Sequence, residues 1–222
     1  MTVSAALARR RSVRDFEDRP VPVDLLKDIL AQALRAPSGG NLQPWQLHLV
    51  LGDRMDQLKA LMQQRVQEHP GGEETDYDIY PRGLKSPYRE RRHDVGERLY
   101  AALGIPREDK LGRMLQFSRN FQFFGAPAGL FVAIDRSMGR PQWSDLGMLM
   151  LSVMLLLEEA GVASCAQECW AVYPKTVGGF LGLPQEQMLF AGMAIGYAKA
   201  APVNDWPVPR APLDEVLRVH GA

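Results

Sequence analysis

Two short segments near the amino terminus carry most of the polar groups suited to binding a ligand. The first, residues 9–16, contains four arginines and a serine: Arg9, Arg10, Arg11, Ser12 and Arg14. Guanidinium groups and a hydroxyl supply hydrogen-bond donors at a density that suits a doubly charged phosphate. This arginine segment therefore predicts a phosphate site, although a solvent-exposed helix face is the simpler explanation when the segment is taken alone.

The second segment, residues 36–45, reads Ala-Pro-Ser-Gly-Gly-Asn-Leu-Gln-Pro-Trp. Its small, turn-forming residues let the backbone approach a ligand closely, and its asparagine and glutamine carry amide groups. By itself this glycine loop is typical of an ordinary turn. It follows the arginine segment within the length of one helix and leads into an apolar run that predicts a strand.

The elements expected to position these segments alternate between helices and strands, without a linker, a repeat or a low-complexity block. Apolar spacing bounded by proline and glycine predicts helices at residues 23–35, 53–68, 87–103, 107–124, 143–160 and 174–181. Short apolar runs predict strands at residues 45–51, 129–134 and 187–197, and residues 161–165 are expected to leave the preceding helix and enter another strand. Residues 73–85 are polar and aperiodic, which predicts a long loop of the kind that usually has a function or is mobile.

Length and composition limit the class of protein. A chain of 222 residues with 46% hydrophobic and 23% charged residues can bury a sizeable core, and a single domain over residues 1–222 is the simplest organisation. Lysine plus arginine equals aspartate plus glutamate at 26 each, so the balance suggests neither nucleic acid nor an anionic membrane as partner. The longest apolar run, residues 146–157, is too short to cross a bilayer, and a cytoplasmic location is expected.

Other site motifs are weak. Cys165 and Cys169 lie four positions apart, which fits neither a redox pair nor a metal knuckle, and both are expected to stay reduced. No metal site is predicted from the four histidines. No Gly-x-Gly-x-x-Gly follows a strand, which argues against a Rossmann site for a nicotinamide.

Two features point to a second copy of the chain. The predicted helix at residues 143–160 is apolar on nearly every face, so it must lie at the centre of the fold or at a subunit interface. Its methionines by themselves indicate core packing. The extended, proline-rich residues 201–215 have little use in a monomer, whereas a partner subunit gives them a surface to lie on.

The two opening segments together resemble the signature of the FMN-dependent nitroreductase family, Arg-Ser-x-Arg-x-Phe followed by Ala-Pro-Ser-x-x-Asn-x-Gln-Pro-Trp. Residues 166–171, Ala-Gln-Glu-Cys-Trp-Ala, are similar to the family's segment beside the flavin ring. Residues 210–215, Arg-Ala-Pro-Leu-Asp-Glu, are similar to its carboxyl terminus. The resemblance extends from residue 7 to about residue 219 and is weakest between residues 69 and 120.

The resemblance implies an α+β fold, a three-layer α/β/α sandwich around a mixed, mainly antiparallel sheet. It also implies an intertwined homodimer with FMN bound in the crevice between subunits. Residues 70–124 would then be a lid-like insertion, and residues 200–222 a C-terminal extension embracing the partner subunit.

The resemblance assigns cofactor contacts to individual residues. Arg10, Ser12 and Arg210 would hold the FMN phosphate with Arg11 as a helper, and Arg14 would reach the N1/O2 edge of the ring. The backbone of residues 168–169 would meet the N5/O4 edge, although many relatives have glycine where this chain has cysteine. The implied cofactor-binding residues are Arg10, Arg11, Ser12, Arg14, Pro37, Ser38, Gly39, Asn41, Gln167, Glu168, Cys169 and Arg210.

The activity implied is hydride transfer from NAD(P)H to nitroaromatic or quinone-like acceptors by a ping-pong mechanism. Donor and acceptor would use one flavin face in turn, and no side chain would be catalytically essential because flavin N5 carries the hydride. The acceptor pocket is expected to include Asn41, Tyr88, Phe123 and Phe124, with core packing as the alternative role of the aromatic residues.

Several alternatives stay open from the sequence. Other branches of the same fold are reductive dehalogenases or flavin-fragmenting enzymes. A flavin-binding protein without significant turnover is a different class, and a phosphate-binding module without flavin is the most remote.

Overall fold

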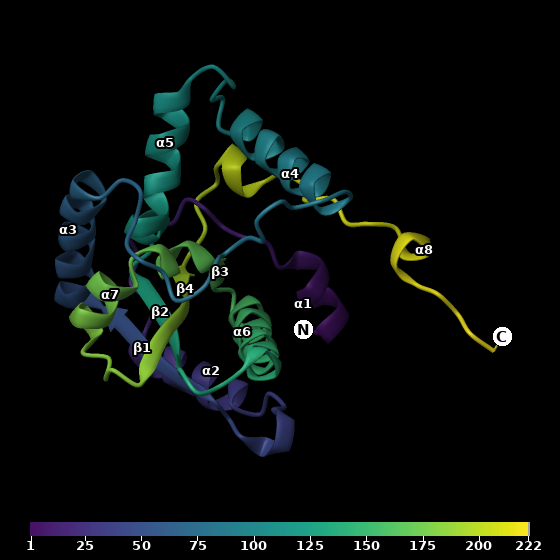
Figure 1. Ribbon diagram of the computed structural model, residues 1–222, viewed down its shortest axis with the longest axis horizontal. Coiled ribbons are helices and arrows are strands. Elements are labelled where there is room, and N and C mark those ends of the chain that lie inside the picture. The colour runs from purple at the N-terminus through teal and green to yellow at the C-terminus, as the bar shows by residue number, and fades with distance from the viewer. Residues whose placement is uncertain (222) are drawn as a thin grey trace.

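A four-stranded antiparallel sheet forms the centre of the computed structural model, which describes residues 1–221 (Figure 1). The strand order is β1-β2-β4-β3, with β1 at Trp45–Leu51, β2 at Ala128–Asp135, β3 at Ala163–Gln167 and β4 at Gln187–Gly196. Strand β2 is buried along nearly its whole length because its sequence is apolar on both faces. The two central strands therefore need cover on both sides.

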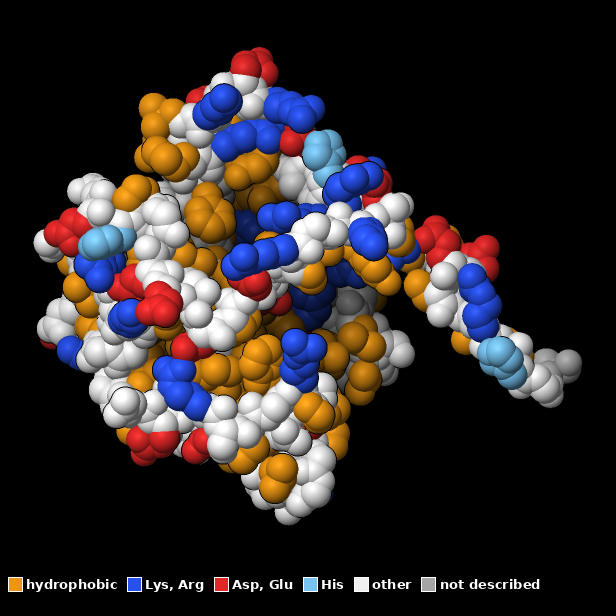
Figure 2. Space-filling model, in the orientation of Figure 1, with side chains coloured by type: hydrophobic (Ala, Val, Ile, Leu, Met, Phe, Trp, Pro, Cys, Tyr) orange, Lys and Arg blue, Asp and Glu red, His pale blue; other side chains and the backbone are white. Residues whose placement is uncertain are grey.

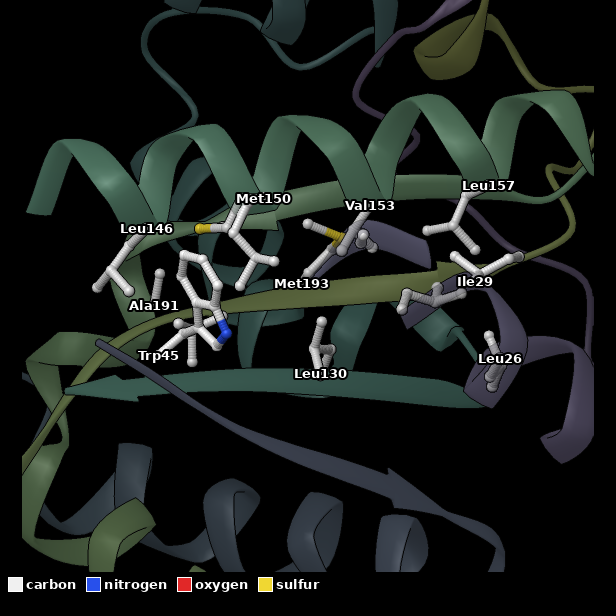
Figure 3. Packing of buried hydrophobic residues seen from close by; sticks show 14 of the residues in the cluster. Leu26, Ile29, Trp45, Leu130, Leu146, Met150, Val153, Leu157, Ala191 and Met193 are labelled. Carbon is white, nitrogen blue, oxygen red and sulfur yellow. The ribbon is translucent and has the colours of Figure 1, made fainter. Parts of the chain in front are cut away.

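Helices and short 3-10 segments supply that cover. One face carries α2 (Val23–Ala33) and α6 (Arg140–Glu159), whose apolar residues pack on the sheet as Figure 3 shows. The other face carries α3 (Gly52–Glu68), α7 (Pro174–Leu181) and the 3-10 segments η2 (Arg119–Gly125) and η3 (Glu168–Val172). The predicted α/β/α layering is confirmed.

Two predicted helices differ from the observed ones by three or more residues at an end. Helix α6 begins three residues early because the Gly139 N–H donates to the Gln142 side chain and Pro141 favours the first turn. The helix predicted at residues 107–124 is wrong at both ends. It is shortened to α5 (Lys110–Ser118), whose start is capped by Asp109, and its continuation tightens into η2.

A helical arm projects from the layers. Helix α4 (Tyr88–Ala102) has no buried residue and, with α5, stands away from the sheet at the top of Figure 1. The remaining short elements are α1 (Val3–Arg9), η1 (Gly39–Asn41), η4 (Pro202–Asn204) and α8 (Leu213–Val216). The carboxyl-terminal tail runs outward from the body (Figure 1 and Figure 2). Among the described residues, no helix is long and apolar enough to span a membrane.

Glycines in the central strands make room for aromatic rings. A Cβ at Gly192 of β4 would lie 2.3 Å from the Trp170 ring, and one at Gly129 of β2 would lie 2.5 Å from the Phe123 ring. The centroids of these two rings are 4.5 Å apart. The packing of these rings on this side of the sheet therefore requires residues without a side chain at both strand positions.

Gly192→Ala should lower the free energy of unfolding by about 1–3 kcal/mol, because the added methyl group overlaps the Trp170 ring. Urea unfolding of the apoprotein measures this difference. Gly96→Ala in α4 is the control, since its added methyl group meets no atom within 4 Å beyond the backbone of its own helix. It should leave stability unchanged or raise it slightly, because alanine favours a helix more than glycine does. Equal midpoints for Gly192→Ala and the wild type would contradict the packing described here.

Candidate functional site

The arginine segment lies along the free edge of β3. Ser12 forms a parallel bridge with Ser164, and the Val13 N–H donates to the Ser164 carbonyl at 3.1 Å. This isolated bridge adds a parallel contact at the edge of a sheet whose four strands pair antiparallel. Since neighbouring side chains of an extended segment point to opposite sides, burial of Val13 in the core turns Ser12 and Arg14 the other way.

A pocket of about 580 Å³ opens beside this segment. Residues from both ends of the chain line it, among them Arg10, Arg11, Ser12, Arg14 and Arg210. Val95 of α4 and Trp206 of the tail add apolar walls. The structure thus brings the four residues predicted at the phosphate into one cavity with Arg14, which was predicted at the ring edge. We call this cavity the arginine pocket.

The charges in the arginine pocket are incompletely neutralised. Arg11 forms an ion pair with Asp205 at 3.0 Å. Within residues 1–221, Arg10, Arg14 and Arg210 make no ion pair, and the last two donate to main-chain carbonyls. Three guanidinium groups without acidic partners and one hydroxyl form a donor set that suits a dianion.

Asn204 connects the tail to the arginine segment and was not identified from the sequence. Its Oδ1 accepts the Arg14 N–H at 2.7 Å, and its Nδ2 donates to the carbonyls of Asp15 and Lys199 at 2.8 and 3.0 Å. The side chain is 4% exposed. A single asparagine in a proline-rich tail carries no spacing signal, so only the folded structure shows that it fixes the backbone of Arg14.

Strand β3 leads from the arginine pocket to the segment expected beside a flavin ring. Gln167 is buried, donates to the Asn120 carbonyl at 2.8 Å and accepts from the Trp170 indole at 3.2 Å. Cys169 follows in η3, and burial raises the pKa of its thiol. It is therefore not a thiolate nucleophile at neutral pH. Partial desolvation also raises the pKa of the Glu168 carboxyl.

The glycine loop lies elsewhere on the protomer. Ser38, Gly39 and Asn41 form or flank η1, between α2 and β1, and exposed Pro37 precedes them. None of these residues lines the arginine pocket. One protomer therefore does not unite the two predicted cofactor-binding segments.

Two residues expected in the acceptor pocket belong to the core instead. The side chains of Phe123 and Phe124 are 0% and 1% exposed. Both residues have a left-handed backbone, with φ of 48° and 54°, which turns the chain so that both rings are buried. The prediction that they line a pocket is corrected, whereas Tyr88 stands exposed at the start of α4.

The loop predicted at residues 73–85 is anchored at its first residues. The Glu73 carboxylate accepts hydrogen bonds from Arg65 at 2.9 Å and from the N–H groups of Lys175 and Thr176 at 2.8 and 3.1 Å. The Tyr77 hydroxyl donates to a main-chain carbonyl of β4, and its ring packs against Trp143. The loop is therefore fixed where it leaves the sheet layers.

Glu73→Gln should destabilise the protein in a pH-dependent way. Burial by itself would raise the pKa of Glu73, but the hydrogen bonds from Thr176, Arg65 and Lys175 outweigh burial and hold the pKa below its usual range. The stabilisation is therefore present above the unfolded-state pKa of about 4.3 and is lost as the pH falls through the lower folded-state value.

Urea unfolding of both proteins at a series of pH values tests this expectation. The difference in free energy of unfolding should be constant above about pH 5.5 and should shrink below about pH 4.3. Glu74→Gln is the control, because that exposed carboxylate pairs only with exposed Lys175. A difference for Glu73→Gln that does not change with pH would contradict the assigned cause.

Comparison with known proteins agrees with this geometry. The protein-family model described as "Nitroreductase family" matches residues 7–197 of this chain. The nitrobenzene nitroreductase of Ectopseudomonas oleovorans is 33% identical over 207 residues, covering 93% of this chain and 91% of that protein.

Two solved structures are similar over nearly their whole length. The FMN and NADPH-dependent nitroreductase NfnB of Sphigopyxis sp. strain HMH has a TM-score of 0.97 and 55% identity, covering 100% of both chains. The FMN-dependent NfnB of Mycobacterium smegmatis, in complex with NADPH, has a TM-score of 0.92 and 31% identity, covering 99% of this chain and 100% of that one. This chain belongs to the nitroreductase family.

Proposed function

We propose that this protein is an FMN-dependent oxidoreductase that transfers hydride from NAD(P)H to nitroaromatic or quinone-like acceptors. The arginine pocket carries the proposal, because its unpaired guanidinium groups lie beside the strand that leads to the flavin-ring segment. The names of the relatives support it, since one is a nitrobenzene nitroreductase and another is FMN and NADPH-dependent. NADPH is therefore the donor to test first.

The residues of the arginine pocket fit the phosphate end of FMN. Arg10, Ser12 and Arg210 would hold the phosphate by charge-assisted hydrogen bonds, and Arg11 is partly engaged by Asp205. Arg14, whose backbone is fixed by Asn204, would place a positive charge at the N1/O2 edge of the ring. The bound flavin would supply the hydride chemistry, so the protein contributes binding and electrostatics.

A second copy of the chain completes the proposed site. Helix α6 exposes a stripe on the side away from the sheet, formed by Ser144, Gly147, Met148 and Leu151. The tail after residue 206 is also largely exposed. In a homodimer, these surfaces would be covered, residues 70–124 would form a lid, and the glycine loop would reach the partner's arginine pocket.

Arg10→Ala and Arg210→Ala should each weaken FMN binding by about 1.5–3 kcal/mol, the scale of a hydrogen bond to a charged group. Titration of the apoprotein with FMN measures the change. Arg98→Ala is a matched control, because this arginine pairs with Asp94 on α4 and does not line the pocket. Unchanged affinity in both pocket variants would remove the phosphate assignment.

Steady-state kinetics should show a ping-pong cycle with NADPH as donor and nitrobenzene as acceptor. Double-reciprocal plots at several fixed acceptor concentrations should be parallel, because donor and acceptor use one site in turn. Intersecting lines would require both substrates to bind together. A yellow protein that NADPH fails to bleach without oxygen would instead favour flavin binding without turnover.

Leu151→Glu should shift the protein toward monomer and reduce its bound FMN, because a charge on the α6 stripe cannot be buried in a subunit interface without a partner. Leu61→Glu on α3 is the control, because Leu61 is 37% exposed, close to the 39% of Leu151, and lies outside the α6 stripe. Sedimentation velocity with absorbance of the flavin follows both quantities. A wild-type protein that sediments as a flavin-loaded monomer would refute the dimer.

A further inference from the structure

Asp145 of α6 is a buried carboxylate without a cation. It is 4% exposed, and it is the only acidic residue in the buried set of residues 1–221. Within that range it makes no ion pair. Both of its oxygens lie 3.3 Å from the same donor, the Gly39 N–H. A buried polar side chain is costly unless it is hydrogen-bonded, so hydrophobic packing does not explain this residue.

Gly39, whose N–H donates to Asp145, begins a strained turn. Gly40, Asn41 and Gln43 have φ values of 57°, 56° and 49°, in the left-handed region that side chains other than glycine adopt at a cost. Ser38 closes the turn locally, because its carbonyl accepts the Asn41 N–H and its hydroxyl accepts the Gln43 N–H, both at 3.0 Å. Such a conformation persists only where surrounding structure holds it.

Little else of the protomer holds this turn. Residues 39–43 are exposed, and the bond from Gly39 to Asp145 is the hydrogen bond that ties them to α6 in the described part of the chain. Asp145 also adjoins the exposed α6 stripe, since Ser144 precedes it and Met148 follows one turn later. The same turn of α6 therefore holds the loop on one side and faces the proposed subunit interface on the other.

We infer that Asp145 is a positioning residue that fixes the Gly39–Asn41 turn in the conformation that contacts FMN across the subunit interface. This inference rests on the proposed function. The carboxylate does not touch the cofactor. It acts by accepting the Gly39 N–H, so removal of either the acceptor or the donor should release the same turn.

Variants on both sides of the hydrogen bond test the inference. Asp145→Ala removes the acceptor, and Gly39→Pro removes the donor at a position where the preceding Ser38 is already extended, as a residue before proline prefers. Asp145→Asn retains an acceptor oxygen. Gly39→Ala retains the N–H, and its added methyl group meets no atom within 4 Å beyond the neighbouring residues, so it is the matched control for proline in the exchange measurement.

Two measurements on the dimeric protein are needed. Hydrogen exchange of the apoprotein reports the Asn41 and Gln43 amides directly, and FMN titration reports the effect on the cofactor. Asp145→Ala and Gly39→Pro should each speed exchange at these amides and weaken FMN binding at least about tenfold. Asp145→Asn should bind FMN within about threefold of the wild type. Gly39→Ala, which keeps the N–H donor, should exchange the Asn41 and Gln43 amides at the wild-type rate. The double variant should bind FMN no more weakly than the weaker single variant.

The outcomes separate this inference from the proposed function. Wild-type exchange and wild-type affinity in Gly39→Pro, which keeps the carboxylate, would overturn the inference even if Asp145→Ala fails to fold. Faster exchange with unchanged FMN affinity would also overturn it, because the loop would then not be a cofactor element, while the arginine pocket would stand. Absence of FMN binding by the wild type would overturn the proposed function itself.

Discussion

Backbone pairing between Ser12 and Ser164 holds the arginine segment along the edge of β3. Strand β3 continues into residues 167–169, so this pairing sets the distance between the arginine pocket and the segment that we propose lies beside the flavin ring. Asn204 adds a second constraint by bonding to the backbone of Arg14 and Asp15. Three parts of the chain, up to 190 positions apart in sequence, thereby form one candidate site along a single sheet edge.

The arrangement concentrates positive charge at a cost to the folded state. Like charges repel, and among the pocket arginines Arg9 and Arg11 are paired with acids in the described chain, whereas Arg10, Arg14 and Arg210 are not. Main-chain carbonyls accept hydrogen bonds from Arg14 and Arg210, which satisfies donors without neutralising charge. The site is therefore preorganised for an anion, and ligand binding offsets electrostatic repulsion that folding alone leaves in place.

The sequence predicted what depends on periodicity and on local motifs. Apolar spacing located the sheet strands and most helices, and the arginine segment marked the pocket because its residues are adjacent. Asn204 and Asp145 were missed because their roles arise from partners 190 and 106 positions away. The pattern at Phe123 and Phe124 looked helical, and their left-handed backbone depends on packing that no local rule encodes. The homodimer, lid and cofactor contacts stay predictions.

The two strand glycines also constrain how this sequence can change over evolutionary time. Gly192 and Trp170 occupy complementary space, as do Gly129 and Phe123, so neither member of a pair can vary alone without overlap or a void. The two rings also contact each other, which joins the pairs into one steric unit. Related sequences with this core should therefore replace these four positions together. Substitutions at the two strand glycines should correlate with substitutions at the aromatic residues of the 3-10 segments that they contact.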